Sequence, residues 1–309
     1  MVRSTWARHV AYRRTSEYFG RNELGSIKQW PRAAQLVFSL VLALATIAIC
    51  VGAYRWLVMG ALEYWFSLSS EAGVVIRRIG TIAMLFTGYW LFARFYERRP
   101  VTEFAFKPTA MLASALAGAL LISLTIALLF SLGNYQVTQY RGFGLAAGVI
   151  GTIFVGALVE EMIFRGIVFR LFEQFFGTTW ALVIPSALFG LAHLGNDGAS
   201  FMTLLSVTLL GAFWTLIYAA SRNIWVASAN HAAWNSAIFL TGLPLSGQTE
   251  WRNAAPLESS YQGSALLTGG AFGPEDSIIN VVFMAVVVLA LWYVGRRRGW
   301  LNVRGEKQA

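Results

Sequence analysis

The chain has 309 residues, of which 57% are hydrophobic and only 13% are charged. An ordinary soluble domain has about 25% charged residues, and much of its surface must face water. The composition therefore excludes a disordered chain, a coiled coil and almost any cytosolic enzyme. It predicts a multi-span membrane protein.

The formal net charge is +9, and the arginines stand at the ends of apolar runs rather than in one patch. This pattern is typical of topology signals and of contact with anionic lipid, so we expect the bilayer, and no nucleic acid, as a partner. The single cysteine, Cys50, lies inside an apolar run and has no second cysteine with which to form an intrachain disulfide.

A helix that crosses a bilayer needs about 20 apolar residues. Apolar runs predict eight such helices, at 34–59, 76–96, 109–132, 143–169, 179–194, 201–220, 223–241 and 277–295. The aromatic stretch around 63–78 is interpreted as a helix on the membrane surface. The predicted fold class is an all-α polytopic membrane protein with about eight transmembrane helices around an intramembrane polar cavity.

Basic residues flank these helices on one side of the predicted topology. They are Arg3, Arg8, Arg13, Arg14, Arg21, Lys28, Arg32, Arg94, Arg98, Arg99, Lys107, Arg165, Arg170, Arg222, Arg296, Arg297 and Arg298. Arg77 and Arg78 are the main exceptions, and Arg141 and Arg252 are single outliers. By the positive-inside rule we expect this side to be cytoplasmic. The chain is then a multi-pass protein of a bacterial inner membrane, with both termini in the cytoplasm and residues 242–275 outside.

The fourth predicted helix carries charges that do not belong in lipid: Glu160, Glu161 and Arg165. One charge at the centre of a membrane helix costs about 2.5–3.5 kcal/mol on insertion scales. Glu161 and Arg165 are four residues apart and are expected to pair on one helix face. Glu160 points about 100° away and is left to accept a proton from water as a general base.

Two histidines lie in other predicted helices. His193 ends the fifth, and His231 shares a helix face with Asn235 in the seventh. The midpoint between Glu160 and His193 falls in the predicted turn near residue 176, so the two should lie at one depth in an antiparallel hairpin. Counting residues from the other end of this helix gives a different depth, because His193 is only a few residues from the predicted outer turn near residue 197.

Together these groups suggest hydrolysis. Glu160 would activate water, His193 would orient it or hold a metal, and His231 with Asn235 would stabilise an oxyanion. Zinc or another divalent metal on Glu160, His193 and His231 is a candidate cofactor. The HExxH signature of common zinc proteases is missing, as is a GxSxG nucleophile motif.

Three motifs in chain order resemble the CAAX-protease and bacteriocin-processing family of intramembrane proteases. EExxxR corresponds to Glu160, Glu161 and Arg165, FxxxH to Phe189 and His193, and HxxxN to His231 and Asn235. The resemblance implies a membrane-embedded endopeptidase, classed among metalloproteases, in which the first Glu activates water and the two His and the Asn complete the site. It implies a peptide or protein substrate associated with the membrane.

We accordingly expect a basic cytoplasmic segment at 1–32, three helices at 33–140 and a catalytic core of four helices at 141–241. An outer loop at 242–275 and a last helix with a basic tail at 276–309 follow. Two alternatives remain open: a proton-coupled transporter, because buried charges also mark ion pathways, and a non-catalytic scaffold or immunity-type protein that uses its polar groups for helix packing.

Overall fold

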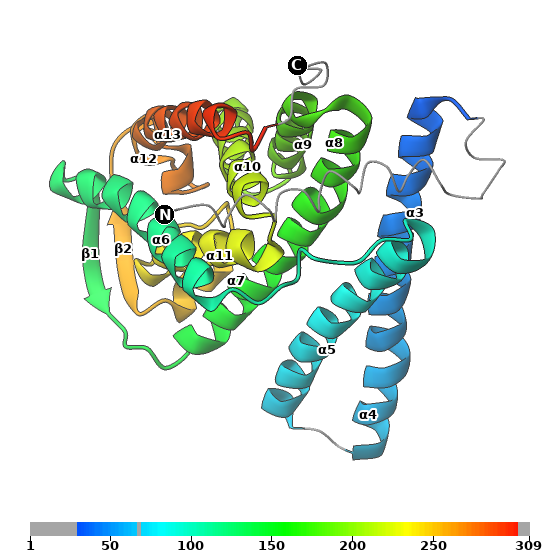
Figure 1. Cartoon of the computed structure of the whole chain (residues 1–309). Coiled ribbons are helices and arrows are strands. Elements are labelled where there is room, and N and C mark those ends of the chain that lie inside the picture. The colour runs from blue at the N-terminus through cyan, green and yellow to red at the C-terminus, as the bar shows by residue number, and fades with distance from the viewer. Residues whose placement is uncertain (1–29, 67–68, 302–309) are drawn as a thin grey trace, which may run out of the picture. The chain divides into compact units, whose positions relative to one another are not determined.

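The computed structural model describes residues 30–66 and 69–301. The chain forms two compact units, Met1–Thr102 and Glu103–Ala309, and each is described here by itself (Figure 1). Most of the predicted basic segment 1–32 lies outside the described residues. The helix that begins at residue 108 belongs to the second unit, not with the two helices that precede it.

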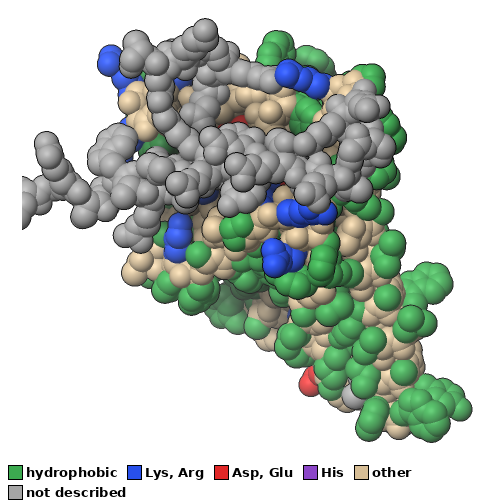
Figure 2. All heavy atoms as spheres, turned by 45° about the vertical axis from the view of Figure 1, so that its right-hand side comes forward, with side chains coloured by type: hydrophobic (Ala, Val, Ile, Leu, Met, Phe, Trp, Pro, Cys, Tyr) green, Lys and Arg blue, Asp and Glu red, His purple; other side chains and the backbone are tan. Residues whose placement is uncertain are grey.

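The first unit is a hairpin of two long helices. Helix α3 (Arg32–Ala53) runs through a π-helical stretch, η4 (Tyr54–Val58), into α4 (Met59–Phe66). Helix α5 (Ser70–Leu91) continues into a second π-helical stretch, η5 (Phe92–Tyr96). Hydrophobic side chains are spread along the visible surface of this hairpin, as a bilayer-facing surface requires (Figure 2).

The predicted surface helix at 63–78 is wrong. Helix α4 ends at Phe66 and α5 begins at Ser70, where the Ser69 side chain caps the new helix by accepting from the amide of Ala72. Arg77 lies inside α5, and its charge is compensated by Glu63 of α4 at 2.6 Å. A charge that seemed to forbid a membrane helix is therefore paired across the hairpin.

The second unit contains seven α-helices of seven residues or more among its described residues. They are α6 (Pro108–Ser131), α7 (Ala146–Glu161), α8 (Arg170–Phe176), α9 (Thr178–Ala192), α10 (Phe201–Ser221), α11 (Ile224–Leu240) and α13 (Ile278–Arg297). A π-helical segment, η6 (Met162–Phe169), joins α7 to α8. The segment between α11 and α13 holds η7 (Glu250–Ala254), β2 (Leu257–Tyr261), α12 (Ala265–Thr268) and η8 (Pro274–Asp276).

The prediction of an all-α polytopic membrane protein is confirmed. Within the described part of the chain, six helices are long and apolar enough to cross a membrane: Arg32–Phe66, Glu71–Tyr96, Pro108–Ser131, Ala146–Phe176, Phe201–Ser221 and Ile278–Arg297. The other two predicted spans are also helical, but α9 has only 15 residues and α11 has 17. The count of eight crossings is therefore not confirmed.

A small sheet was not predicted. Strand β1 (Tyr135–Tyr140) pairs antiparallel with β2, with Tyr135 opposite Tyr261 and a bulge between Val137 and Gln139. The phenol of Tyr135 donates to the carbonyl of Thr268, which ties the start of β1 to α12.

Two helix pairs in this unit pack with their backbones close together. A β-carbon added at Gly190 of α9 would lie 2.4 Å from Thr208 Oγ1 and 2.8 Å from the carbonyl of Leu204, both on α10. A β-carbon at Gly118 of α6 would lie 2.5 Å from the carbonyl of Asn230 on α11. These glycines therefore fix the spacing of α9 on α10 and of α6 on α11.

Candidate active site

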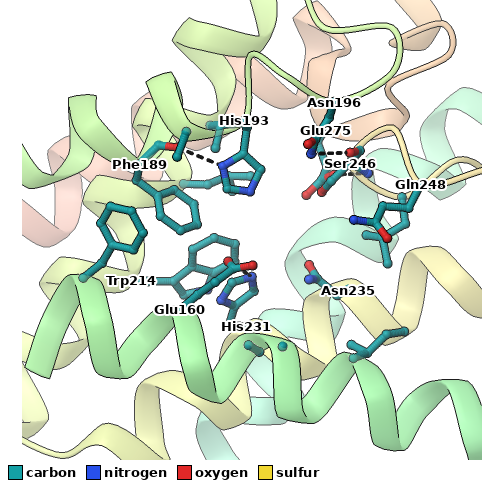
Figure 3. A pocket seen from close by; sticks show the side chains of 18 of the residues that line it. Glu160, Phe189, His193, Asn196, Trp214, His231, Asn235, Ser246, Gln248 and Glu275 are labelled. Atoms are coloured by element: carbon teal, nitrogen blue, oxygen red, sulfur yellow. Dashed lines mark hydrogen bonds and ion pairs between the residues drawn. The ribbon is translucent and has the colours of Figure 1, made fainter. Parts of the chain in front are cut away.

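A cavity of about 270 Å³ lies within the second unit, between α7, α9, α11 and the segment that follows α11 (Figure 3). Its wall includes Glu160, His193, His231 and Asn235, which we refer to as the four motif residues. The structure thus brings together side chains that three helices supply, although they lie up to 75 positions apart in the sequence.

Glu161 and Arg165 form the ion pair that their spacing predicts. Arg165 Nη1 donates to Glu161 Oε1 at 2.8 Å, and both side chains are almost fully buried. Arg165 also donates to the carbonyl of Gly211 at 2.8 Å and lies over the ring of Phe189 at 4.8 Å. This pair lies outside the cavity wall and holds η6 against α9 and α10.

Glu160 has a different environment from its neighbour. Its side chain is 38% exposed and lines the cavity, whereas the side chain of Glu161 is 0% exposed. Glu160 Oε2 lies 3.8 Å from His231 Nε2, which is longer than a hydrogen bond. The turn of about 100° between adjacent helix residues is the reason that one carboxylate packs and the other faces the cavity.

His231 is held on two sides. Its Nδ1 lies 3.0 Å from Glu161 Oε1, and its ring stacks on Trp214 at a centroid distance of 3.7 Å. An ionised carboxylate only accepts hydrogen bonds, so we assign the proton to Nδ1. In the neutral ring Nε2 is then an acceptor that faces Glu160.

His193 directly follows α9 as its C-cap residue. Its Nδ1 lies 2.8 Å from the carbonyl of Phe189, so Nδ1 donates and Nε2 is left to accept. Phe189 is buried among Arg165, Trp214 and Phe164, which explains how it fixes the histidine. His193 therefore lies at the C-terminal end of α9, directly before the turn that follows it.

Asn235 lies one helical turn after His231, on the same face of α11. Its side-chain oxygen is buried and has no hydrogen-bond partner among the described residues. A buried polar atom without a hydrogen-bond partner costs free energy of folding. The Asn235 oxygen is therefore placed to accept a hydrogen bond from a polar group that enters the cavity.

The sequence analysis missed a fifth polar group, Glu275. It is 2% exposed and lines the cavity. Its Oε2 accepts from the amide of Ser246 at 3.0 Å and from the hydroxyl of Ser246 at 2.6 Å, and its Oε1 accepts from Trp234 Nε1 at 3.3 Å. Burial raises the pKa of this carboxyl to about 7.

Ser246 is held in a left-handed backbone conformation, with φ of 48°. Such a conformation is uncommon for a non-glycine residue and persists where neighbours enforce it. Here Glu275 binds the amide and hydroxyl, while Asn196 Nδ2 donates to the carbonyl at 2.8 Å. The resulting tight turn brings the Gln248 side chain into the cavity wall (Figure 3).

The signal for Glu275 in the sequence was misleading. Gly273, Pro274, Glu275 and Asp276 resemble the start of a helix, where acids favour the helix dipole. Helix α13 instead begins at Ile278 with Ser277 as its cap, and the two acids turn inward. Asp276 accepts hydrogen bonds from the hydroxyls of Thr203 and Ser206 on α10.

The metal that the sequence suggests has no preformed set of three ligands in the described part of the chain. Among the described residues, no group of three His, Cys, Asp or Glu side chains is arranged closely enough to hold a metal ion. One nitrogen of His231 is engaged by Glu161 and one of His193 by a backbone carbonyl. Metal binding by Glu160, His193 and His231 therefore stays a prediction.

Comparison with known proteins identifies the segment that contains the four motif residues. Residues 142–237 match the model of the Rce1-like type II CAAX prenyl endopeptidases. The protein named "Putative membrane peptidase YdiL" of Bacillus subtilis (strain 168) is 30% identical over 95 residues, which is 31% of this chain and 37% of that relative. No solved structure matches this chain. These matches confirm, for residues 142–237, the resemblance to the CAAX-protease and bacteriocin-processing family that the three motifs predict.

Proposed function

We propose that this protein is a membrane-embedded endopeptidase in which Glu160 activates a water molecule. The observation that carries the proposal is the cavity itself. It holds one partly exposed carboxylate, two histidines whose rings are fixed by hydrogen bonds, and an asparagine with an unsatisfied oxygen. The similarity of residues 142–237 to membrane peptidases supports the same reaction class.

In the proposed reaction, Glu160 takes a proton from water while the water oxygen attacks the carbonyl carbon of a peptide bond. His193 Nε2 accepts the second hydrogen of that water and orients it. Glu160 then passes its proton to the amide nitrogen as the carbon–nitrogen bond breaks. The products are a carboxylic acid, which passes its proton to the amine, and that amine, so no other reactant is needed.

The oxyanion of the tetrahedral intermediate must be stabilised by hydrogen-bond donors. The Nδ2 group of the Asn235 side chain supplies one. His231 Nε2 supplies another when the ring is protonated, because Glu161 at Nδ1 then balances its positive charge. In this scheme Glu161 and Arg165 are positioning residues, which act by holding His231 and Phe189.

The test is Glu160→Gln, which keeps the shape of the side chain and removes the base. Loss of a general base is expected to lower the cleavage rate about 10²- to 10⁴-fold. Purified wild type and variant are incubated with a library of membrane-tethered peptides, and products are read by mass spectrometry with and without a chelator. Glu258→Gln, a carboxylate on β2 that pairs with Arg141, is the matched control.

Thermal unfolding of the same variants separates the alternatives. The scaffold hypothesis predicts that Glu160→Gln mainly lowers thermal stability, and the transporter hypothesis predicts ion-coupled flux in liposomes that needs Glu160. Cleavage by folded Glu160→Gln at the rate of the wild type would contradict the proposed mechanism. Metal content measured on wild type, Glu160→Gln and His193→Gln decides whether a metal belongs to the site.

A further inference from the structure

The second unit has two ends that the hydrogen bonds distinguish. At one end, Lys107 Nζ donates to the carbonyl of Ser221 at 3.3 Å, and Arg222 binds Glu173 of α8 and the carbonyl of Trp300, just after α13. The start of α6 thus lies beside the ends of α8, α10 and α13. We call this the basic end.

The cavity end lies at the opposite termini of α10 and α13, beside the C-terminal ends of α9 and α11. Asn196, just after α9, binds the carbonyl of Ser246 at 2.8 Å. Asp276, just before α13, binds the first turn of α10 through Thr203. Ser259 of β2 donates to the carbonyl of Thr241 at the end of α11 at 2.5 Å. The segment 242–275 is therefore confined to this end.

Charge is divided unequally between the two ends. The basic end carries Lys107, Arg170, Arg222, Arg296, Arg297 and Arg298 against the acids Glu103 and Glu173. The cavity end carries Asp197, Glu250, Glu258, Glu275 and Asp276 against Arg141 and Arg252. Lys and Arg in short connections favour the cytoplasmic side of a membrane, so the basic end belongs there.

The cavity is closed toward the basic end, and residues of the cavity end, among them Asn196, Ser246 and Gln248, also line it. Below the motif residues, Arg165, Phe189 and Trp214 are each no more than 1% exposed and form a packed floor. Gly156 of α7 and Ala192 of α9 line the cavity and are both exposed. A β-carbon added at Gly156 would meet no atom within 4 Å, so protein atoms do not close the cavity beside this part of α7.

We infer that the cavity is entered from the extracytoplasmic side of the membrane, and that its substrate is a peptide segment presented at that face. The side on which the cavity opens is inferred from the unequal charge of the two ends and from the packed residues that close the cavity toward the basic end. The cleavage of a peptide there rests on the proposed function. The residues around the opening come from α7, α9 and the segment 242–275, so a substrate that enters here contacts this segment as well as the two helices.

Cysteine labelling tests the sidedness without depending on activity. In a Cys50→Ser background, single cysteines replace Ala192 at the cavity, Asn253 at the exposed cavity end and Ala105 at the exposed basic end. A membrane-impermeant maleimide is applied to bacterial spheroplasts that express each variant, before and after lysis. We expect Ala192→Cys and Asn253→Cys to react before lysis and Ala105→Cys only after it. The reverse order would overturn the inference.

A second arm tests the substrate side. A peptide that detergent-solubilised wild type cleaves is given a charged, impermeant tag and added to intact spheroplasts carrying wild type or Glu160→Gln. Cleavage by intact wild-type spheroplasts alone supports an extracytoplasmic substrate. Cleavage in detergent or after lysis, but not by intact spheroplasts, overturns it and leaves the peptidase standing. If no library peptide is cleaved in detergent, the peptidase proposal fails, and labelling of Ala192→Cys still decides the side of the opening.

Discussion

Replacement of Arg165 by methionine should destabilise the protein more than most single changes can. Arg165 is 1% exposed and donates to Glu161 and to the carbonyl of Gly211, each at 2.8 Å. Hydrogen bonds that involve a charged group contribute about 1.5–3 kcal/mol each. Two of them give about 3–6 kcal/mol, which agrees with the roughly 3–5 kcal/mol cost of removing one partner of a buried ion pair.

A double-mutant cycle makes this prediction sharper. Glu161→Gln alone leaves the Arg165 charge buried without its counter-charge and should also cost about 3–5 kcal/mol. The double variant removes both charges, so its loss in free energy of unfolding should fall short of the sum of the single losses by about 2–3 kcal/mol. Recovery will be incomplete because His231 also binds Glu161.

The free energy of unfolding is measured on purified protein in mixed micelles, by titration with a denaturing detergent while tryptophan fluorescence is recorded. The reasoning is refuted if Arg165→Met costs less than about 1 kcal/mol, because a buried pair cannot then be holding η6 in place. It is also refuted if the two single losses add up to that of the double variant, because the side chains would then not be coupled.

Two further predictions concern packing and pH. Gly118→Ala should lower the free energy of unfolding by about 1–3 kcal/mol, because the added β-carbon would collide with Asn230. In Gly148→Ala on α7 the added β-carbon meets no atom within 4 Å, so this variant should be neutral or more stable by up to ~1 kcal/mol. Thermal unfolding of both variants checks this order. Burial raises the pKa of Glu275 from 4.5 to about 7, so its stabilising contribution is complete below about pH 4.5 and is lost as the pH rises through about 7. This loss is about 3 kcal/mol. Melting temperatures of Glu275→Gln between pH 4 and pH 8.5 should therefore vary less with pH than those of the wild type, and equal slopes would contradict the assignment.

Most of what the sequence predicts about the site follows from the spacing of residues along single helices. The pairing of Glu161 with Arg165, and the divergence of Glu160 from them, follow from the helix period alone and are present in the structure. The placement of His231 and Asn235 on one face follows from the same rule. Because the apolar runs also fixed the order of the helices, the meeting of α7, α9 and α11 was within reach of the sequence.

The parts that sequence reasoning missed depend on contacts distant along the chain. Strand β1 is paired with a partner about 120 positions later, and nothing local marks it as a strand. Glu275 enters the cavity because the segment 242–275 folds back over α11, which places Ser246 and Trp234 against it. A hydropathy pattern contains no information about such a fold-back, so the acid was interpreted by its local position.

The close contact of α9 with α10 has a consequence for how the proposed endopeptidase would accommodate different peptides. Gly190 meets the backbone of α10, and Gly211 of α10 approaches within 3.1 Å of Ser186 on α9 when a β-carbon is added. Two helices in such contact cannot slide past one another without collision. The part of the cavity wall that carries Phe189 and His193 is therefore rigid. Adjustment to bulky or small substrate side chains must then fall to the turn that carries Ser246 and Gln248, and differences in peptide preference among related proteins should map to that turn.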